Sequence, residues 1–380
     1  MDRMNDSSAP DAPAVAHPSR VAGVLAAGAV GDALGYVVEF DDVPAIRARL
    51  GAEGLTDADA LLVVTGGRDL PVSDDTQLTL FVLDGLLEWI EWQNAGQAAD
   101  PAACVWLACL RWHRTQTGAL PEGAPPAPDR WIDAHPELRV RRAPGNACLS
   151  GLDTAAMGLP GDPRNPGSKG CGTVMRSAPY GMVPGLEDRH VVSLARQGAV
   201  LTHGHPTAWT AAAAYALTVS ALFRGRELAE AVAHARSWLD TVGADGAETA
   251  AALDAAVAAA ADAPHDAGAP GTLPSALGAG WVAEEALAIA VYAALVGRAR
   301  TADPAAALAL ALRIGVNHGG DSDSTASLAG QLLGARHGVA VLGRADAAVD
   351  AEAAASAVPG WIRERDVLAE AVRRWVGATS

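Results

Sequence analysis

One stretch of the chain decides the fold class: residues 73–92, which read SDDTQLTLFVLDGLLEWIEW. Its large apolar residues recur at the spacing of an α-helix and share one face: Leu78, Phe81, Val82, Leu86, Trp89 and Ile90. Hydroxyl and carboxylate side chains stand just before them, where helices commonly begin. We therefore predict an amphipathic helix over 77–92 that begins directly after Ser73–Thr76.

Helical patterns continue through most of the chain. Leu328, Leu332 and Leu333 repeat the spacing in a predicted helix over 326–336. Alanine-rich helical patterns cover 208–223, 246–262, 282–297 and 304–315. Alternating β patterns are scarce, and the short apolar run Leu61–Val64 has no partner strand. Proline and glycine mark loops over 118–168 and 263–280. These patterns predict an all-α fold, a compact orthogonal helical bundle in a single domain.

Composition limits the classes of function. The 380 residues are 50% apolar, enough for a sizeable core, and the formal net charge is −16. Bulk binding to nucleic acid or to an anionic membrane is therefore not expected. The four cysteines form no C-x-x-C pair, and the abundance of alanine and glycine is typical of a GC-rich bacterial genome. We expect a monomer in a bacterial cytoplasm.

The expected domain organisation is simple. Residues 1–20 lack an apolar core and are predicted to be a disordered tail. The domain would span 21–345, and 346–380 would be a helical extension of that domain.

Two acidic motifs precede predicted helices, Ser73-Asp74-Asp75-Thr76 and Gly319-Gly320-Asp321-Ser322-Asp323-Ser324-Thr325. Each motif alone is compatible with an ordinary helix N-cap. If the two helices pack side by side, however, four carboxylates converge, and their mutual repulsion requires cations. Together the motifs predict a dinuclear site for Mg²⁺ or Mn²⁺ at helix N-termini.

Three further motifs are weaker signals. Gly31-Asp32-Ala33-Leu34-Gly35 would allow close helix packing, with Asp32 at a helix end or in a structural hydrogen bond, and Glu39 beyond it could be a surface residue. The glycines of Ser168–Arg176 could present N–H groups to phosphate or form an ordinary turn. In Leu201–Pro206, His203 could contact a ligand or be structural.

Read together, these residues resemble the ADP-ribosylglycohydrolase family, which includes dinitrogenase reductase-activating glycohydrolase and the ADP-ribosyl-acceptor hydrolases. The matching motifs are GDALG with Glu39 beyond it, SDDT, GCGTVMRSAP, LTHGHP and GGDSDSTASLAGQLLGA. They stand in the family's order and span residues 21–338, nearly the whole chain.

The resemblance implies an all-α fold with two Mg²⁺ or Mn²⁺ ions, held by Ser73, Asp74, Asp75, Asp321, Asp323 and Ser324. It also implies that Glu39 lies on a mobile loop over the metals. The implied ligand-binding residues are Gly170, Cys171, Gly172 and Thr173, which would cradle a diphosphate, and His203. Ser322 and Ser324 stand where many members carry threonine, and Cys171 replaces an asparagine or another polar residue.

The activity that the resemblance implies is hydrolysis of the glycosidic bond between ADP-ribose and an acceptor, with Glu39, Asp74 and Asp321 as catalytic residues. The substrate would be an ADP-ribosylated protein or small molecule, and the sequence does not fix the acceptor. One of the carboxylates Asp74 and Asp321 would accept a proton, while Glu39 would shield the metals or transfer a proton. Two alternatives remain open: a non-catalytic, ADP-ribose-binding or crystallin-like member, and a two-metal phosphoester hydrolase.

Overall fold

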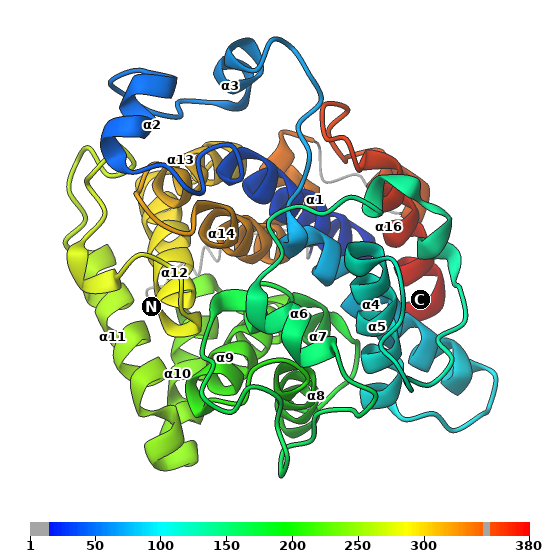
Figure 1. Ribbon diagram of the computed structural model, residues 1–380. Helices are drawn as coiled ribbons and strands as arrows, with labels where there is room; N and C mark the ends of the chain where they lie inside the picture. The colour runs from blue at the N-terminus through cyan, green and yellow to red at the C-terminus, as the bar shows by residue number, and fades with distance from the viewer. Residues whose placement is uncertain (1–14, 345–349) are drawn as a thin grey trace, which may run out of the picture.

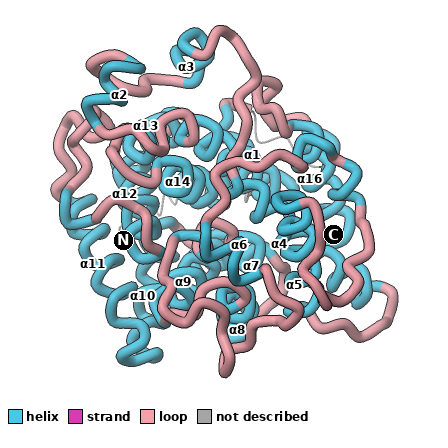
Figure 2. Tube along the Cα trace, in the orientation of Figure 1, coloured by secondary structure: helices cyan, strands magenta, loops and turns pink. Residues whose placement is uncertain are grey.

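The computed structural model describes residues 15–344 and 350–380. Over these ranges the chain folds into helices joined by loops and forms no strand, only isolated β-bridges (Figure 2). The all-α prediction is therefore confirmed. In the same ranges, no helix combines the length and the apolar character needed to cross a bilayer.

Helices α1 (His17–Gly35) and α14 (Ser322–His337) form the centre of the molecule (Figure 1). A Cβ added at Gly334 would lie 2.2 Å from the Gly23 carbonyl oxygen, and one added at Gly35 would lie 2.3 Å from the Ser322 carbonyl oxygen. The two helices thus run antiparallel with their backbones in contact, which only residues without side chains allow. The pairing places the end of α1 beside the start of α14.

Other helices enclose this central pair. Those packed directly against it include α4 (Asp74–Asn94), α9 (Pro206–Phe223), α12 (Ala283–Arg300), α13 (Pro304–Val316), α15 (Ala351–Ala355) and α16 (Arg365–Thr379). Farther out are α2 (Val43–Leu50), α3 (Ala58–Val64), α5 (Pro101–Thr117), α6 (Asn146–Leu152), α7 (Ala178–Met182), α8 (Asp188–Val200), α10 (Leu228–Val242) and α11 (Ala247–Ala261). Their buried apolar side chains form one continuous core.

Most predicted helices are present with shifts of a few residues at their ends, such as α4, which begins at Asp74 rather than at 77. The apolar run Leu61–Val64, for which the sequence showed no partner strand, forms the end of helix α3. One prediction was wrong: the predicted tail extends too far, because α1 begins at His17 and buries Ser19 and Arg20. Residues 1–14, and the expected boundary at 345/346, lie outside the described residues.

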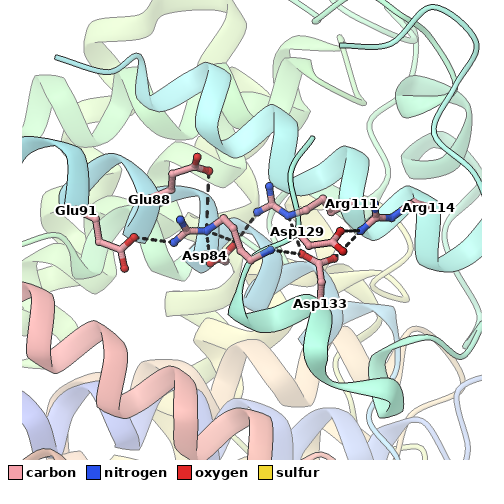
Figure 3. A network of polar contacts seen from close by, with 8 residues as sticks. Asp84, Glu88, Glu91, Arg111, Arg114, Asp129 and Asp133 are labelled. Atoms are coloured by element: carbon pink, nitrogen blue, oxygen red, sulfur yellow. Dashed lines mark hydrogen bonds and ion pairs between the residues drawn. The ribbon is translucent and has the colours of Figure 1, made fainter. Parts of the chain in front are cut away.

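A network of ion pairs fixes the long loop after α5 (Figure 3). Asp84, on α4 and fully buried, pairs with Arg111 on α5 and accepts from Arg130 Nε at 2.9 Å. Arg111 Nε also lies 3.2 Å from Asp133 Oδ2 on the loop. The loop is therefore attached to α4 and α5, and its continuation at 141–145 reaches the cavity described next.

Candidate functional site

A cavity of about 540 Å³ lies where α1, α4 and α14 meet. Both acidic motifs line it, through Asp74 and Asp75 from α4 and Asp321, Asp323 and Ser324 from the start of α14. Glu39, just after α1, also lines it. The structure thus brings together the two motifs that the sequence separates.

Asp32 fixes the start of α4. From within α1, its Oδ1 accepts from Ser73 N at 2.8 Å and its Oδ2 from Thr76 N at 3.0 Å. These amides belong to the first turn of α4, whose N–H groups have no partner inside the helix. Of the two roles considered for Asp32, the structure shows the hydrogen-bonding one.

The two acidic motifs touch each other. Ser324 Oγ donates to Asp75 Oδ2 at 2.6 Å, so the start of α14 is hydrogen-bonded to the first turn of α4. Ser73 does not line the cavity; its hydroxyl accepts from Asp75 N at 3.2 Å and also hydrogen-bonds to Asp323. Ser73 therefore acts in this structure as the N-cap of α4.

Burial and the closeness of the carboxylates to one another raise the pKa of these acidic side chains. Burial first, and the neighbouring Asp323 second, raise the pKa of Asp74, Asp75 and Asp321 well above its usual range. The same two causes, in the same order, raise the pKa of Glu39 to about 10. Among the residues lining the cavity, the described part of the chain supplies one side chain with a fixed positive charge, Arg141.

The donor chemistry of the cluster fits a divalent cation. Hard carboxylate oxygens are the ligands of Mg²⁺ and Mn²⁺, and a cation would offset the repulsion between them. Glu39 Oε2 is buried and has no hydrogen-bond partner, so it has an unused acceptor. Within residues 15–344 and 350–380, no three His, Cys, Asp or Glu side chains form a complete ion-binding group. Binding would therefore require carboxylates to rotate inward.

The glycine loop agrees with the sequence prediction only in part. Gly170, Cys171 and Gly172 line the cavity, but Thr173 does not, because its buried hydroxyl donates to Ala208 O at 2.8 Å. The N–H of Cys171 donates to Trp281 O at 3.2 Å and does not face the cavity. As a correction, the Thr173 side chain and the Cys171 amide hold the loop in place instead of being free for a diphosphate.

His203 lies beneath this loop and lines the cavity. Its Nδ1 is 2.7 Å from Thr202 Oγ1, and burial, followed by the charge of Arg176, lowers the pKa of His203 to about 3. The ring is therefore neutral and can offer Nε2 to a ligand. By contrast, His205 accepts from Thr207 N at 3.2 Å and caps α9.

Sequence reasoning missed two aromatic residues of the cavity, Phe40 and Trp281. Their rings stack with centroids 6.2 Å apart and an interplanar angle of 17°, and they are 74% and 44% exposed. Large aromatic side chains left exposed beside a polar cavity are typical of ligand contacts. The available signals were the place of Phe40 directly after Glu39 and that of Trp281 at the end of a glycine-rich loop.

Comparisons with known proteins bear on the family and the fold of the chain. A family model described as ADP-ribosylglycohydrolase matches residues 13–376. One similar solved structure is described as an "ADP-ribosylglycohydrolase-related protein complex"; it is 24% identical, and the match covers 96% of this chain and 99% of that chain with a TM-score of 0.58. That likeness shows the fold, while no curated protein matches the sequence significantly. Because the family model spans nearly the whole chain, the chain belongs to the ADP-ribosylglycohydrolase family.

Proposed function

We propose that this chain is a metal-dependent hydrolase that cleaves the glycosidic bond between ADP-ribose and an acceptor. The main observation in support is the hydrogen bond between Ser324 and Asp75, which joins two acidic motifs that are far apart in the sequence but line one cavity. The cavity volume of about 540 Å³ is in the range of small-molecule sites. Family membership supports the same hydrolase chemistry.

The proposed cofactor is a pair of Mg²⁺ or Mn²⁺ ions. Their ligands would come from both motifs: Asp74, Asp75, Asp321, Asp323 and Ser324 line the cavity, and Ser73, whose hydroxyl caps α4 in this structure, would be a sixth. When bound, the ions would supply Lewis acidity and orient the hydroxyls of the distal ribose. They would also let the buried carboxylates ionise, because their charge offsets the repulsion that now raises each pKa.

The chain's own residues would then direct the bond exchange. A water oxygen attacks the anomeric carbon, and the electron pair of the broken glycosidic bond leaves with the acceptor. Asp74 or Asp321 accepts the proton that the water loses. Glu39, whose Oε2 is buried and unpaired, would transfer a proton or exclude bulk water. His203 and the Gly170–Gly172 loop would hold the remainder of ADP-ribose.

The test compares Asp321→Ala with Asp303→Ala. Both aspartates stand at the N-cap position of a helix, but Asp303 precedes α13 and does not line the cavity, so it controls for the loss of a carboxylate at a helix start. Substrates with different ADP-ribose linkages would be incubated with Mg²⁺, with Mn²⁺ and with a chelator, and free ADP-ribose measured. We expect the wild-type chain and Asp303→Ala to release ADP-ribose only with metal, and Asp321→Ala to release none.

Three results would contradict the proposal. Undiminished release by Asp321→Ala would remove that residue from the mechanism. Release of inorganic phosphate or of a nucleotide instead of ADP-ribose would indicate a phosphoester hydrolase. A wild-type chain that binds no stoichiometric Mg²⁺ or Mn²⁺ would match a non-catalytic member of the family.

A further inference from the structure

The segment that leads into the first acidic motif is paired with the C-terminal region. Leu70 N donates to Trp361 O at 2.9 Å, and Arg363 N donates to Leu70 O at 2.9 Å. These bonds form a short parallel bridge between Leu70 and Ile362. Helix α16, which follows this region, packs beside α4 (Figure 1). The C-terminal region therefore lies against the chain three residues before Ser73.

A buried ion pair holds both main-chain polar groups of Val72, two residues after Leu70. Val72 N donates to Glu364 Oε2 at 3.0 Å, and Arg142 Nη1 donates to Val72 O at 2.8 Å. Arg142 and Glu364 are bonded to each other and are 4% and 0% exposed. Because one ion pair binds both the N–H and the C=O of Val72, this residue cannot shift without breaking buried charge-assisted hydrogen bonds.

The same arginine belongs to the loop that contacts Asp74. Asp74 N donates to Arg142 O at 3.2 Å, and Gly145 N lies 3.4 Å from Asp74 Oδ2. The Arg142–Glu364 pair therefore fixes the chain just before Asp74 and also the loop beside its carboxylate. Neither member of the pair lines the cavity, so neither is a ligand or a catalytic residue.

We propose that Arg142 and Glu364 are positioning residues, which set the affinity of the acidic site for divalent cations by holding Val72 and, through it, Asp74 and Asp75. This inference rests on the proposed function of that site. Its basis is that metal sites require ligand oxygens within a few tenths of an ångström, and supporting residues typically contribute about 10- to 100-fold in metal affinity. The C-terminal region would thus be part of the functional unit although it contributes no ligand.

The test uses Glu364→Gln with Leu368→Ala as the matched control. Glutamine keeps an oxygen for Val72 N–H but removes the charge opposite Arg142. Leu368 is fully buried in α16 one turn further on, and its truncation destabilises the protein through a cavity alone, without removing a charge. Loss of one charge of a buried ion pair is also strongly destabilising, so both variants should unfold at a lower urea concentration than the wild-type chain.

Two measurements distinguish a role in positioning the acidic site from a general loss of protein stability. Titration calorimetry with Mn²⁺ should show affinity about 10- to 100-fold weaker in Glu364→Gln and within about 2-fold of wild type in Leu368→Ala. Amide hydrogen exchange of the metal-free protein should be faster across 72–76 in Glu364→Gln than in Leu368→Ala. Arg142→Lys, which keeps the charge but cannot form the same fork, should weaken Mn²⁺ binding in the same direction.

Equal Mn²⁺ affinities in the two variants, or equal exchange across 72–76, would overturn the positioning role. If Glu364→Gln does not fold, Glu364→Asp, which retains the charge on a shorter side chain, is measured in its place with the same expectation. A wild-type chain that fails to bind Mn²⁺ refutes the proposed function of the site. In that case the hydrogen exchange of 72–76 still decides whether the Arg142–Glu364 pair holds this segment.

Discussion

Replacing Gly31 by alanine should damage the acidic site from a distance. Gly31 lies in α1 and touches the backbone of α14: an added Cβ would stand 2.2 Å from Ala326 O, whereas real Cβ atoms keep at least 3.0 Å. The atoms that it meets are main chain, so no side chain can rotate away. The two helices must therefore separate by about 0.8 Å, the difference between these two distances.

The expected cost has two parts. Overpacking of a well-packed core typically destabilises by about 1–3 kcal/mol, which should lower the free energy of unfolding accordingly. The movement also displaces Asp321 and Asp323, at the start of α14, relative to Asp74 and Asp75 on α4. Misplacement of catalytic groups by about 1 Å can cost roughly 100-fold in rate. We therefore expect kcat/KM for ADP-ribose release to fall on that order.

The matched control is Gly377→Ala. Gly377 is also helical, in α16, but an added Cβ there meets nothing within 4 Å. Alanine should be neutral or stabilise this helix by about 0.5–1 kcal/mol, because it restricts the unfolded chain. Urea unfolding gives the free energies, and release of ADP-ribose under saturating Mg²⁺ gives the rates. If Gly31→Ala matched Gly377→Ala in both measurements, the close contact between α1 and α14 would not control the site.

Three other outcomes are expected. In metal-free protein the pKa of Asp32 is raised from 3.8 to about 7, and that of Glu39 from 4.5 to about 10. The folded state therefore holds these protons more tightly than the unfolded state, so the free energy of unfolding is highest at low pH and falls as pH rises through the two raised pKa values. Urea unfolding in chelator should show this decline between about pH 5 and pH 9, Mg²⁺ should reduce it, and a rise in stability would contradict the sign. Ser324→Ala removes the 2.6 Å bond to Asp75, and calorimetry should show Mn²⁺ affinity about 10- to 100-fold weaker; an unchanged affinity would exclude Ser324 as a ligand. Trp281→Ala, at a side chain 44% exposed, should raise KM for the ADP-ribosylated substrate while kcat and the unfolding midpoint change little; an unchanged KM would exclude a substrate contact.

The sequence predicted the helices well because their periodicity is local. The apolar spacing of 77–92 and the alanine-rich patterns required no knowledge of distant partners, and α4, α9, α11, α12 and α13 lie where these patterns indicated. The run Leu61–Val64, which forms the end of α3, was left unassigned because four apolar residues are too few to show a period. The start of α1 was missed because its first turn contains polar residues, Ser19 and Arg20, which the fold buries.

The site was predictable where residue type alone indicates chemistry. Asp74, Asp75, Asp321 and Asp323 were chosen as carboxylates at helix starts, and the structure brings both motifs into one cavity. The sequence could not show which way each side chain points. Thr173 donates to Ala208 O on α9, a contact between residues 35 positions apart that no local pattern indicates.

The sequence also could not identify residues that affect the site indirectly, by holding neighbouring residues in position. Glu364 and Arg142 look like ordinary surface charges in the sequence, and they belong to no motif. Only the fold places them on either side of Val72.

The pairing of α1 with α14 has a consequence for how the protein is made. Each helix buries its glycine-lined face against the other, yet α14 is synthesised roughly 300 residues after α1, a delay of about 15–60 s at ribosomal rates of about 5–20 residues per second. During that interval the nascent α1 has no native partner for this face. The contact between α1 and α14 at the centre of the molecule can therefore form only late, after most of the chain has been synthesised.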